Sequence, residues 1–248
     1  MSSDTLIMLR RNVKHTRRNP VTLFNSIFMP VIMMLMFVYV FGGAFNVGGA
    51  DYVDYATPGM LMMAITYGLS ATAVSVSSDM TKGIINRFKV MDVSRGAVLT
   101  GHVVSTVVRT AFAVTAIIGM ALLFGFRPNG SLVDWLAAAG VLLLVIVAVS
   151  WLTVAFGLGA KSVEAAGFFA VPLIMLPFFS SAIVPADKMG PGIREFAQYQ
   201  PFTSIIESVR GFLAGAPNLG QTLAAIAWSL AIAVFGYVWA RSQFAKRA

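Results

Sequence analysis

The sequence predicts an all-α integral membrane protein with six transmembrane helices and both termini in the cytoplasm. First, 58% of its 248 residues are hydrophobic and only 11% are charged, whereas a soluble domain carries roughly 25% charged residues. Second, apolar stretches recur at lengths of about 20 residues or more, which is what a helix needs to cross a bilayer. Third, the Lys and Arg residues gather in alternating loops. With so few charges, much of the surface must face lipid.

The six spans follow from the apolar stretches between the charged segments. The first lies near Phe24–Phe45, and Pro30 in its first third is expected to kink it. The other five are placed at 55–78, Val103–Phe124, 135–160, 165–186 and Leu219–Ala240.

The orientation follows from the excess of Lys and Arg that cytoplasmic loops carry. One side of the membrane receives thirteen basic residues: Arg10, Arg11, Lys14, Arg17, Arg18, Lys82, Arg87, Lys89, Arg95, Lys161, Arg241, Lys246 and Arg247. The other side receives four, Arg127, Lys188, Arg194 and Arg210. The side with thirteen is therefore the cytoplasm. The net charge of +8 sits at span ends and not along one face, so it indicates a membrane surface and not nucleic acid.

Residues 1–20 are predicted to form an amphipathic helix along the inner leaflet. Leu6, Leu9 and Val13 share one helical face, and basic residues turned toward anionic lipid occupy the rest. These basic residues are Arg10, Arg11, Lys14, Arg17 and Arg18. The alternative is a disordered basic tail. No cleavable signal peptide is expected, because the first span is too long for one.

The region 185–218, before the last span, is predicted to contain two short amphipathic helices. Gly192–Tyr199 and Phe202–Leu213 are separated by Pro201, and Gly215 and Pro217 end the second. Half-length helices beside a span indicate re-entrant segments, which require cover by protein or a water-filled cavity. The alternative is an extracellular loop on the headgroups.

Catalytic and cofactor chemistry is missing from the sequence. There is no Cys, and the two His residues, His15 and His102, are far apart. No acidic residue lies centrally in a span, which disfavours a proton relay. The segment 157–162 resembles the end of a phosphate-binding loop, but Ala160 stands where that loop needs Gly before Lys161. We therefore expect no enzyme activity, metal or cofactor in this chain, and a source of energy outside it.

Arg109 is the one basic residue inside a predicted span. Its side chain either extends to the cytoplasmic headgroups or faces an inner cavity that attracts an anionic or polar substrate. On the same span Ala111, Thr115 and Gly119 recur every four residues, so another helix can approach closely. That stripe fits packing within one subunit as well as pairing of two.

The cytoplasmic loop after the second span is predicted to contain a short amphipathic helix. Ile84, Ile85, Phe88 and Met91 fall on one stripe, which can dock into a groove of a partner. The full set is Lys82, Gly83, Ile84, Ile85, Asn86, Arg87, Phe88, Lys89 and Met91. The alternative is a helix that lies on anionic lipid.

Three blocks in this order resemble type-2 ABC exporter permeases of the daunorubicin/doxorubicin-resistance kind. They are Asp79–Phe88 with Val93–Gly101, then Glu164–Ala166 with Pro172 and Phe179–Pro185, then Gln200–Thr203 with Val209–Gly211 and Gly215. The resemblance covers essentially the whole chain. Phe202 stands where Val is more frequent, and Asp92 stands where Pro is common.

This resemblance implies a single transmembrane domain, 1–248, that pairs with a second copy and with two ATP-binding subunits. ATP and Mg²⁺ would bind to those subunits, and Lys82–Met91 would be the coupling helix that contacts them. The implied divisions are 24–184 for spans one to five, 185–218 for the re-entrant region, 219–240 for span six and 241–248 for a basic tail. Residues assigned to the substrate pathway are Arg109, Phe179, Phe202, Glu207 and Arg210.

The expected function is ATP-driven export of an amphiphilic drug, antibiotic or lipid-like substrate across a bacterial cell membrane. Apolar spans with few central charges suit such a hydrophobic cargo better than a small ion. Two alternatives remain open: export of a polysaccharide or glycolipid by the same fold, and a membrane scaffold that recruits a soluble partner without transport.

Overall fold

The computed structural model describes residues 20–43, 51–81 and 95–247, and every regular element among them is a helix. Four helices are long and apolar enough to cross a membrane: Tyr52–Thr81, Leu99–Leu123, Leu132–Gly159 and Leu219–Lys246. Two shorter apolar helices cover Phe28–Val40 and Val163–Phe179. The predicted all-α, multi-pass class is confirmed, with four of the predicted spans at full length.

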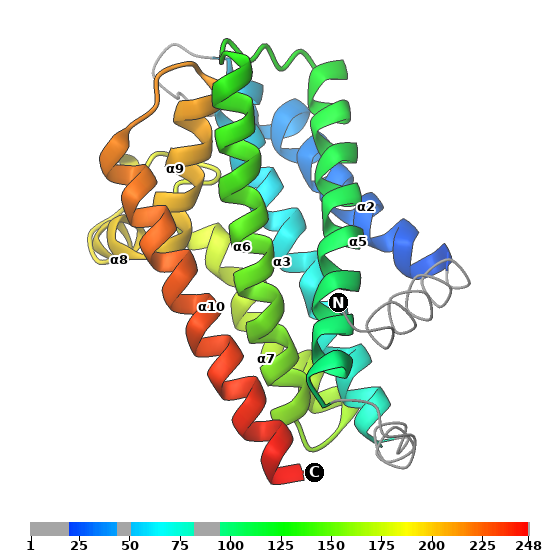
Figure 1. The fold of residues 1–248 in the computed structure, drawn as a ribbon. Coiled ribbons are helices and arrows are strands. Elements are labelled where there is room, and N and C mark those ends of the chain that lie inside the picture. The colour runs from blue at the N-terminus through cyan, green and yellow to red at the C-terminus, as the bar shows by residue number, and fades with distance from the viewer. Residues whose placement is uncertain (1–19, 44–50, 82–94, 248) are drawn as a thin grey trace.

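The long helices run side by side along the bundle (Figure 1). The bounds of the helices are α2 (Pro20–Leu35), the π-helix η1 (Met36–Phe41), α3 (Tyr52–Thr81), α5 (Arg95–Leu123), α6 (Leu132–Gly159), α7 (Val163–Met175), the 3-10 helices η2 (Leu176–Phe179) and η3 (Ala186–Lys188), α8 (Ile193–Tyr199), α9 (Pro201–Leu213) and α10 (Leu219–Arg247). Pro30 lies inside α2, and α2 begins at Pro20, where a missing N–H costs nothing.

Helix α3 is the centre of the bundle. It contacts α2, α5, α6, α7 and α9, and Ala56, Leu61, Ile65 and Leu69 along it have no exposed surface. A membrane helix that is covered on all sides is held by close packing, because lipid offers it no hydrophobic driving force to associate. Buried polar groups on α3 therefore find their partners inside the protein, either on a carbonyl one turn earlier in α3, as Thr57 and Thr66 do, or on a neighbouring helix, as Thr72 does.

Glycine allows α6 to approach α3 closely. A Cβ atom on Gly157 would lie 2.6 Å from the backbone oxygen of Ala73 in α3. This is the segment whose sequence resembled the end of a phosphate-binding loop, and Gly157 and Gly159 lie within helix α6. The glycine at 157 thus serves helix packing.

The bundle has two distinct ends. The α5–α6 connection and the α9–α10 connection lie at one end, while the last turn of α3, the first turn of α5 and the end of α10 lie at the other (Figure 1). At the first end Asn129 and Gly130 both donate backbone hydrogen bonds to the Leu213 carbonyl at 3.0 Å. The backbone N–H of Arg127 donates to Asp54 Oδ1 at 2.9 Å. These contacts tie the α5–α6 connection to the start of α3 and to the end of α9, which are far apart in sequence.

The start of α5 differs from the sequence prediction, whereas the end of α9 agrees with it. Helix α5 begins at Arg95, well before the apolar stretch that begins at Val103. It includes polar residues such as His102, whose surface is only 8% exposed because it packs against α3. Helix α9 ends as predicted: Gly215 has a φ of 73°, and Ala216 N–H donates to the Gly211 carbonyl, which is a Schellman cap.

Candidate functional site

The first polar site lies beside the start of α3, where the helical structure of the chain is interrupted between α7 and α9. Helix α7 narrows into η2, and Ser180, which follows, has an extended backbone. A Cβ atom on Gly59 of α3 would lie 2.4 Å from the Ala182 carbonyl oxygen, so the two backbones are in direct contact. The Tyr52 hydroxyl donates to the Ile183 carbonyl at 3.2 Å. The interrupted segment is thus pressed against α3.

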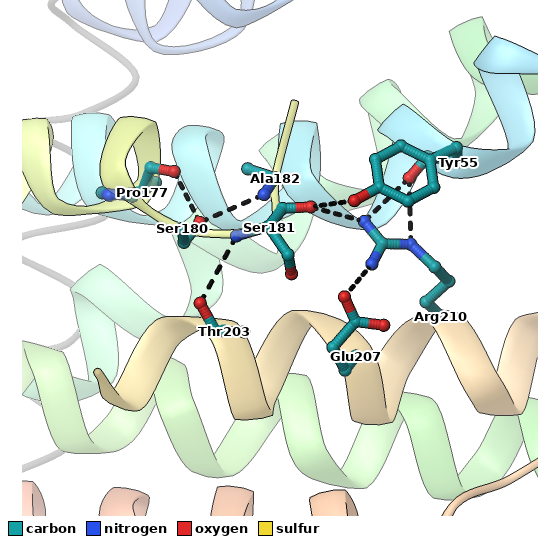
Figure 2. A network of polar contacts seen from close by, with 8 residues as sticks. All are labelled: Tyr55, Pro177, Ser180, Ser181, Ala182, Thr203, Glu207 and Arg210. Carbon is teal, nitrogen blue, oxygen red and sulfur yellow. Dashed lines mark hydrogen bonds and ion pairs between the residues drawn. The ribbon is translucent and has the colours of Figure 1, made fainter. Parts of the chain in front are cut away.

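Arg210 of α9 satisfies the carbonyl groups of this interruption (Figure 2). Its Nη2 donates to the Ser181 carbonyl at 2.8 Å and to the Tyr55 carbonyl at 3.1 Å. Its Nε donates to the same Tyr55 oxygen at 3.2 Å, and its Cζ lies 3.8 Å from the centroid of the Tyr55 ring. The Tyr55 hydroxyl also donates to the Ser181 carbonyl, at 2.9 Å. One guanidinium therefore links α3, α9 and the segment after η2.

Glu207 balances the charge of Arg210. It lies one helical turn earlier on α9 and forms an ion pair with Arg210 Nη1. The side chains of Arg210 and Glu207 are 15% and 32% exposed. In a partly buried setting a charge is stable only when it is paired and hydrogen-bonded. The site meets both conditions, and we call Tyr55, Ser181, Glu207 and Arg210 the outer joint.

The start of α9 completes the cover of the interrupted segment. Gln200 Nε2 donates to the Phe179 carbonyl at 2.6 Å and to the Leu176 carbonyl at 3.3 Å. Thr203 Oγ1 accepts from the Ser181 N–H at 3.3 Å. Backbone freed from a helix at membrane depth needs such partners, because lipid supplies none.

A second polar site lies at the midpoint of α5. Arg109 Nη2 donates to the Gly68 carbonyl at 3.0 Å and to Thr72 Oγ1 at 2.8 Å, both on α3. Thr72 Oγ1 in turn lies 2.9 Å from Thr106 Oγ1 of α5. Among the described residues the partners of Arg109 are neutral, and its buried Nε has no hydrogen-bond partner. We call Arg109, Gly68, Thr72 and Thr106 the central site.

The same α3–α5 seam carries an ionisable pair near the end of α3 and the start of α5. His102 Nε2 lies 3.4 Å from Asp79 Oδ2, and Thr106 donates to the His102 carbonyl at 2.8 Å. Thr106 therefore connects this pair to the central site. Helix α3 ends two residues after Asp79, so the pair ties together the helix ends that flank the 82–94 segment.

Comparison with known proteins identifies the family of this chain. Residues 3–213 match the ABC-2 type transporter family. The chain belongs to the ABC-2 type transporter family. It is 29% identical over 214 residues, 86% of this chain and 76% of the relative, to the "Daunorubicin resistance ABC transporter permease protein DrrB1" of Streptomyces coeruleorubidus. It is 25% identical over 234 residues, 94% of this chain and 84% of the relative, to the "Probable doxorubicin resistance ABC transporter permease protein DrrC" of Mycobacterium tuberculosis.

Membership in the ABC-2 family defines the part that this chain plays. It is a permease subunit, a multi-pass membrane component that lacks the ATPase domain. ABC-2 permeases pair with ATP-binding subunits, to which ATP binding belongs. Within residues 20–43, 51–81 and 95–247, the structure holds no group of three or more His, Asp or Glu side chains that could bind a metal.

The pathway residues named from the sequence fall into different surroundings. Glu207 and Arg210 come together in the outer joint, and Arg109 forms the central site, which is bonded to the same helix, α3. Phe202 is only 1% exposed and packs in the hydrophobic core, whereas Phe179 is 46% exposed.

The predicted coupling helix, Lys82–Met91, and the predicted interfacial helix with Arg10, Arg11, Lys14, Arg17 and Arg18 lie outside the described residues. Sequence reasoning did not find Tyr55, nor the pairing of Asp79 with His102. Ser181 stood in one of the family-like blocks, which was the available signal for it.

Proposed function

We propose that this ABC-2 permease exports an amphiphilic compound, a drug, an antibiotic or a lipid-like molecule, with ATP hydrolysed by a separate subunit. The observation that carries the proposal is that the relatives over most of the chain are named as daunorubicin and doxorubicin resistance permeases. Two structural features support an amphiphilic cargo and a motor outside this chain.

The first feature is that the two arginines inside the bundle, Arg210 and Arg109, are bonded to protein groups. Arg210 is neutralised by Glu207 and bonded to two backbone carbonyls, so the outer joint offers no free charge to a cargo. Arg109 is the remaining central charge, and it donates to α3. A pathway for small ions usually keeps acidic or histidine side chains at mid-membrane. A mostly apolar interior favours a cargo with a hydrophobic body.

The proposed topology has six crossings, with both termini in the cytoplasm, in a single transmembrane domain of residues 1–248. The α2–η1 and α7–η2 helices supply the first and fifth crossings beside the four long ones. After η2 the chain passes through η3 and α8, and α9 then runs back toward the end of the bundle that holds the α5–α6 connection (Figure 1). Helix α9 rises about 18 Å from Pro201 to Leu213, which is roughly three-fifths of the hydrocarbon thickness. That length supports a re-entrant α8–α9 region on the extracellular side.

The second feature is the pair of helix ends that carry the 82–94 segment. Helices α3 and α5 end and begin beside that segment, at the same end of the bundle as the C-terminus (Figure 1). The Asp79–His102 pair joins them. A push on Lys82–Met91 by an ATPase subunit would therefore move α3 and α5 together, and α3 carries both the central site and the outer joint.

Pairing of two permease copies with two ATPase subunits completes the proposal. The stripe of Ala111, Thr115 and Gly119 is not used for packing within the described part of the chain: a Cβ on Gly119 would meet no atom within 4 Å, and the surface of the stripe is open. Phe112 beside the stripe is 68% exposed. This open face of α5 supports close approach of a second copy.

The test is the ATPase activity of the reconstituted complex. The chain is co-expressed with the ATPase encoded beside it, purified and placed in lipid vesicles, and ATP turnover is recorded with and without daunorubicin or doxorubicin. We expect stimulation by the drug, and we expect Phe88→Ala or Arg87→Glu to abolish it while the permease remains in the membrane.

Phe168→Ala is the matched control, because Phe168 is 75% exposed on α7 and lies far from the 82–94 segment in sequence. It should leave drug stimulation unchanged. Full stimulation in Phe88→Ala would refute the coupling helix. Failure of any ATPase to co-purify would favour a scaffold over an exporter.

A further inference from the structure

A cavity of about 380 Å³ opens at the end of the bundle that holds the C-terminus. It is formed between α5, α6 and the last turns of α10. The described residues that line it are Leu99, Thr100, Trp151, Tyr237, Arg241, Phe244 and Ala245. It lies apart from the outer joint, at the opposite end of the bundle, and no residue of the central site lines it.

The lining combines an apolar wall with one cation. The rings of Trp151 and Tyr237 meet edge to face, with centroids 5.0 Å apart. Leu99 and Phe244 are each 5% exposed and close the apolar part of the cavity. Arg241 is exposed; its Nη1 donates to the Tyr237 hydroxyl at 3.4 Å, and its Cζ lies 5.7 Å from the centroid of the Tyr237 ring.

The charge of Arg241 is not balanced within the cavity. None of the described lining residues is acidic. The Tyr237 hydroxyl leaves most of the guanidinium donors available, since arginine carries five N–H groups. The cavity therefore fits a ligand with an anionic group at one end and an apolar body, and it disfavours a cationic amphiphile.

The position of the cavity identifies which anionic amphiphile is available. The distribution of Lys and Arg assigns this end of the bundle to the cytoplasm. Trp and Tyr side chains are typical of the headgroup level. The cytoplasmic leaflet is rich in anionic lipid, and basic pockets between transmembrane helices bind such headgroups.

We propose that this cavity binds an anionic phospholipid of the cytoplasmic leaflet, with the phosphate on Arg241 and the first part of an acyl chain against Trp151, Leu99 and Phe244. This inference goes beyond the proposed export function and depends only on the orientation of the chain. The lipid would hold α5, α6 and α10 together at this end of the bundle.

The test measures lipid contact at Trp151. The full chain is purified in detergent and titrated with phosphatidylglycerol or phosphatidylcholine, each brominated on the acyl chain, and tryptophan fluorescence is recorded. Bromine quenches a tryptophan only at close contact. We expect phosphatidylglycerol to quench at a concentration at least tenfold lower than phosphatidylcholine, and we expect Trp151→Phe to remove this high-affinity component, while tryptophans on the open surface, such as Trp228, are quenched equally by both lipids.

Substitutions on α10 separate a site from general attraction to a basic surface. Arg241→Gln should weaken phosphatidylglycerol binding about tenfold, the loss typical of a hydrogen bond to a charged group. Lys246→Gln removes the same charge from the same helix but lies outside the cavity lining, and should have a severalfold smaller effect. Arg241→Lys keeps the charge without the planar fork and should fall between the two.

Three results would overturn the proposal. Equal quenching by the two lipids would remove the headgroup preference. An equal loss in Arg241→Gln and Lys246→Gln would leave only general surface attraction. Competition by inorganic phosphate or glycerol phosphate as potent as that of short-chain phosphatidylglycerol would make the cavity a site for a free anion.

Discussion

The outer joint and the central site both hold an arginine against the backbone of α3, but they treat its charge differently. Arg210 has a carboxylate partner in Glu207, an aromatic ring in Tyr55 and two carbonyl acceptors. Arg109 has one carbonyl and one hydroxyl, and its Nε has no hydrogen-bond partner among the described residues. The neighbours of the two arginines thus differ in one respect: Arg210 has a partner of opposite charge and holds three segments together, whereas the charge of Arg109 is only partly compensated.

The outer joint has the properties of a fixed connection. Its hydrogen bonds link α3, α9 and the segment after η2, and the contact at Gly59 leaves no room between the two backbones. It fastens the interrupted segment after η2 to two continuous helices, α3 and α9. We therefore expect this region to contribute to stability more than to movement.

The central site has the properties of a connection that can be rearranged. It lies about 20 Å farther along α3 than the Tyr55 carbonyl, on the same seam as the Asp79–His102 pair. A charge held only by neutral groups in a low dielectric is costly, and such residues in membrane spans mark functional sites by default. The difference between the two arginines can be tested by substitution.

The largest effect is expected from Arg210→Met. The change removes the cation and leaves Glu207 and the Ser181 and Tyr55 carbonyls with fewer partners. Breaking one side of a buried ion pair typically lowers the free energy of unfolding by about 3 kcal/mol or more. Thermal unfolding of the purified protein in detergent, followed by tryptophan fluorescence, measures the loss.

Two further variants sharpen the result for Arg210. In Arg210→Met/Glu207→Met both charges are absent, so this double variant should be more stable than Arg210→Met alone. Arg194 is a matched control, because it donates to the Met189 carbonyl from an exposed position. Arg194→Met should change the stability by no more than about 0.5 kcal/mol. Equal losses of unfolding free energy in Arg194→Met and Arg210→Met would contradict a stabilising role for the outer joint.

The next effect concerns the backbone contact of the outer joint. Gly59→Ala places a methyl group where the Ala182 backbone already lies. Because a backbone segment cannot rotate away as a side chain can, the change should destabilise the protein by roughly 1–3 kcal/mol. The same unfolding measurement tests this prediction.

Gly140→Ala is the control for Gly59→Ala. A Cβ atom on Gly140 of α6 meets nothing within 4 Å, and alanine favours a helix over glycine by up to about 1 kcal/mol. This variant should therefore be as stable as the unchanged protein or slightly more stable. If Gly59→Ala behaved like Gly140→Ala, α3 and the segment after η2 would not be in direct contact.

The long helices and the short helices α8 and α9 could be predicted because their signals are local. Apolar length marks the spans, and Pro201, Gly215 and Pro217 mark the limits of the second short helix. The start of α5 was missed for the opposite reason. Polar residues such as His102 interrupt the apolar pattern, and only packing against α3 makes them part of the helix.

The outer joint could not be predicted as a unit. The Arg210–Tyr55 bond joins residues 155 positions apart, and its acceptor is a backbone carbonyl, which no side-chain pattern reveals. Phe202 illustrates the same limit. An aromatic residue beside a predicted pathway could line it or fill the core, and the structure places Phe202 in the core.

Among the variants of the two arginine sites, the smallest effect on stability, and the sharpest contrast with Arg210→Met, is expected from Arg109→Met. Methionine fills the volume without the desolvation cost of a charge whose described partners are neutral, so the free energy of unfolding should change by less than about 1 kcal/mol, in either direction. Drug-stimulated ATP turnover of the reconstituted complex should nevertheless fall, and Arg109→Lys should retain part of it. A stability loss as large as that of Arg210→Met, with unchanged turnover per folded molecule, would show that Arg109 is a structural residue like Arg210. The proposed difference between the two sites would then be wrong.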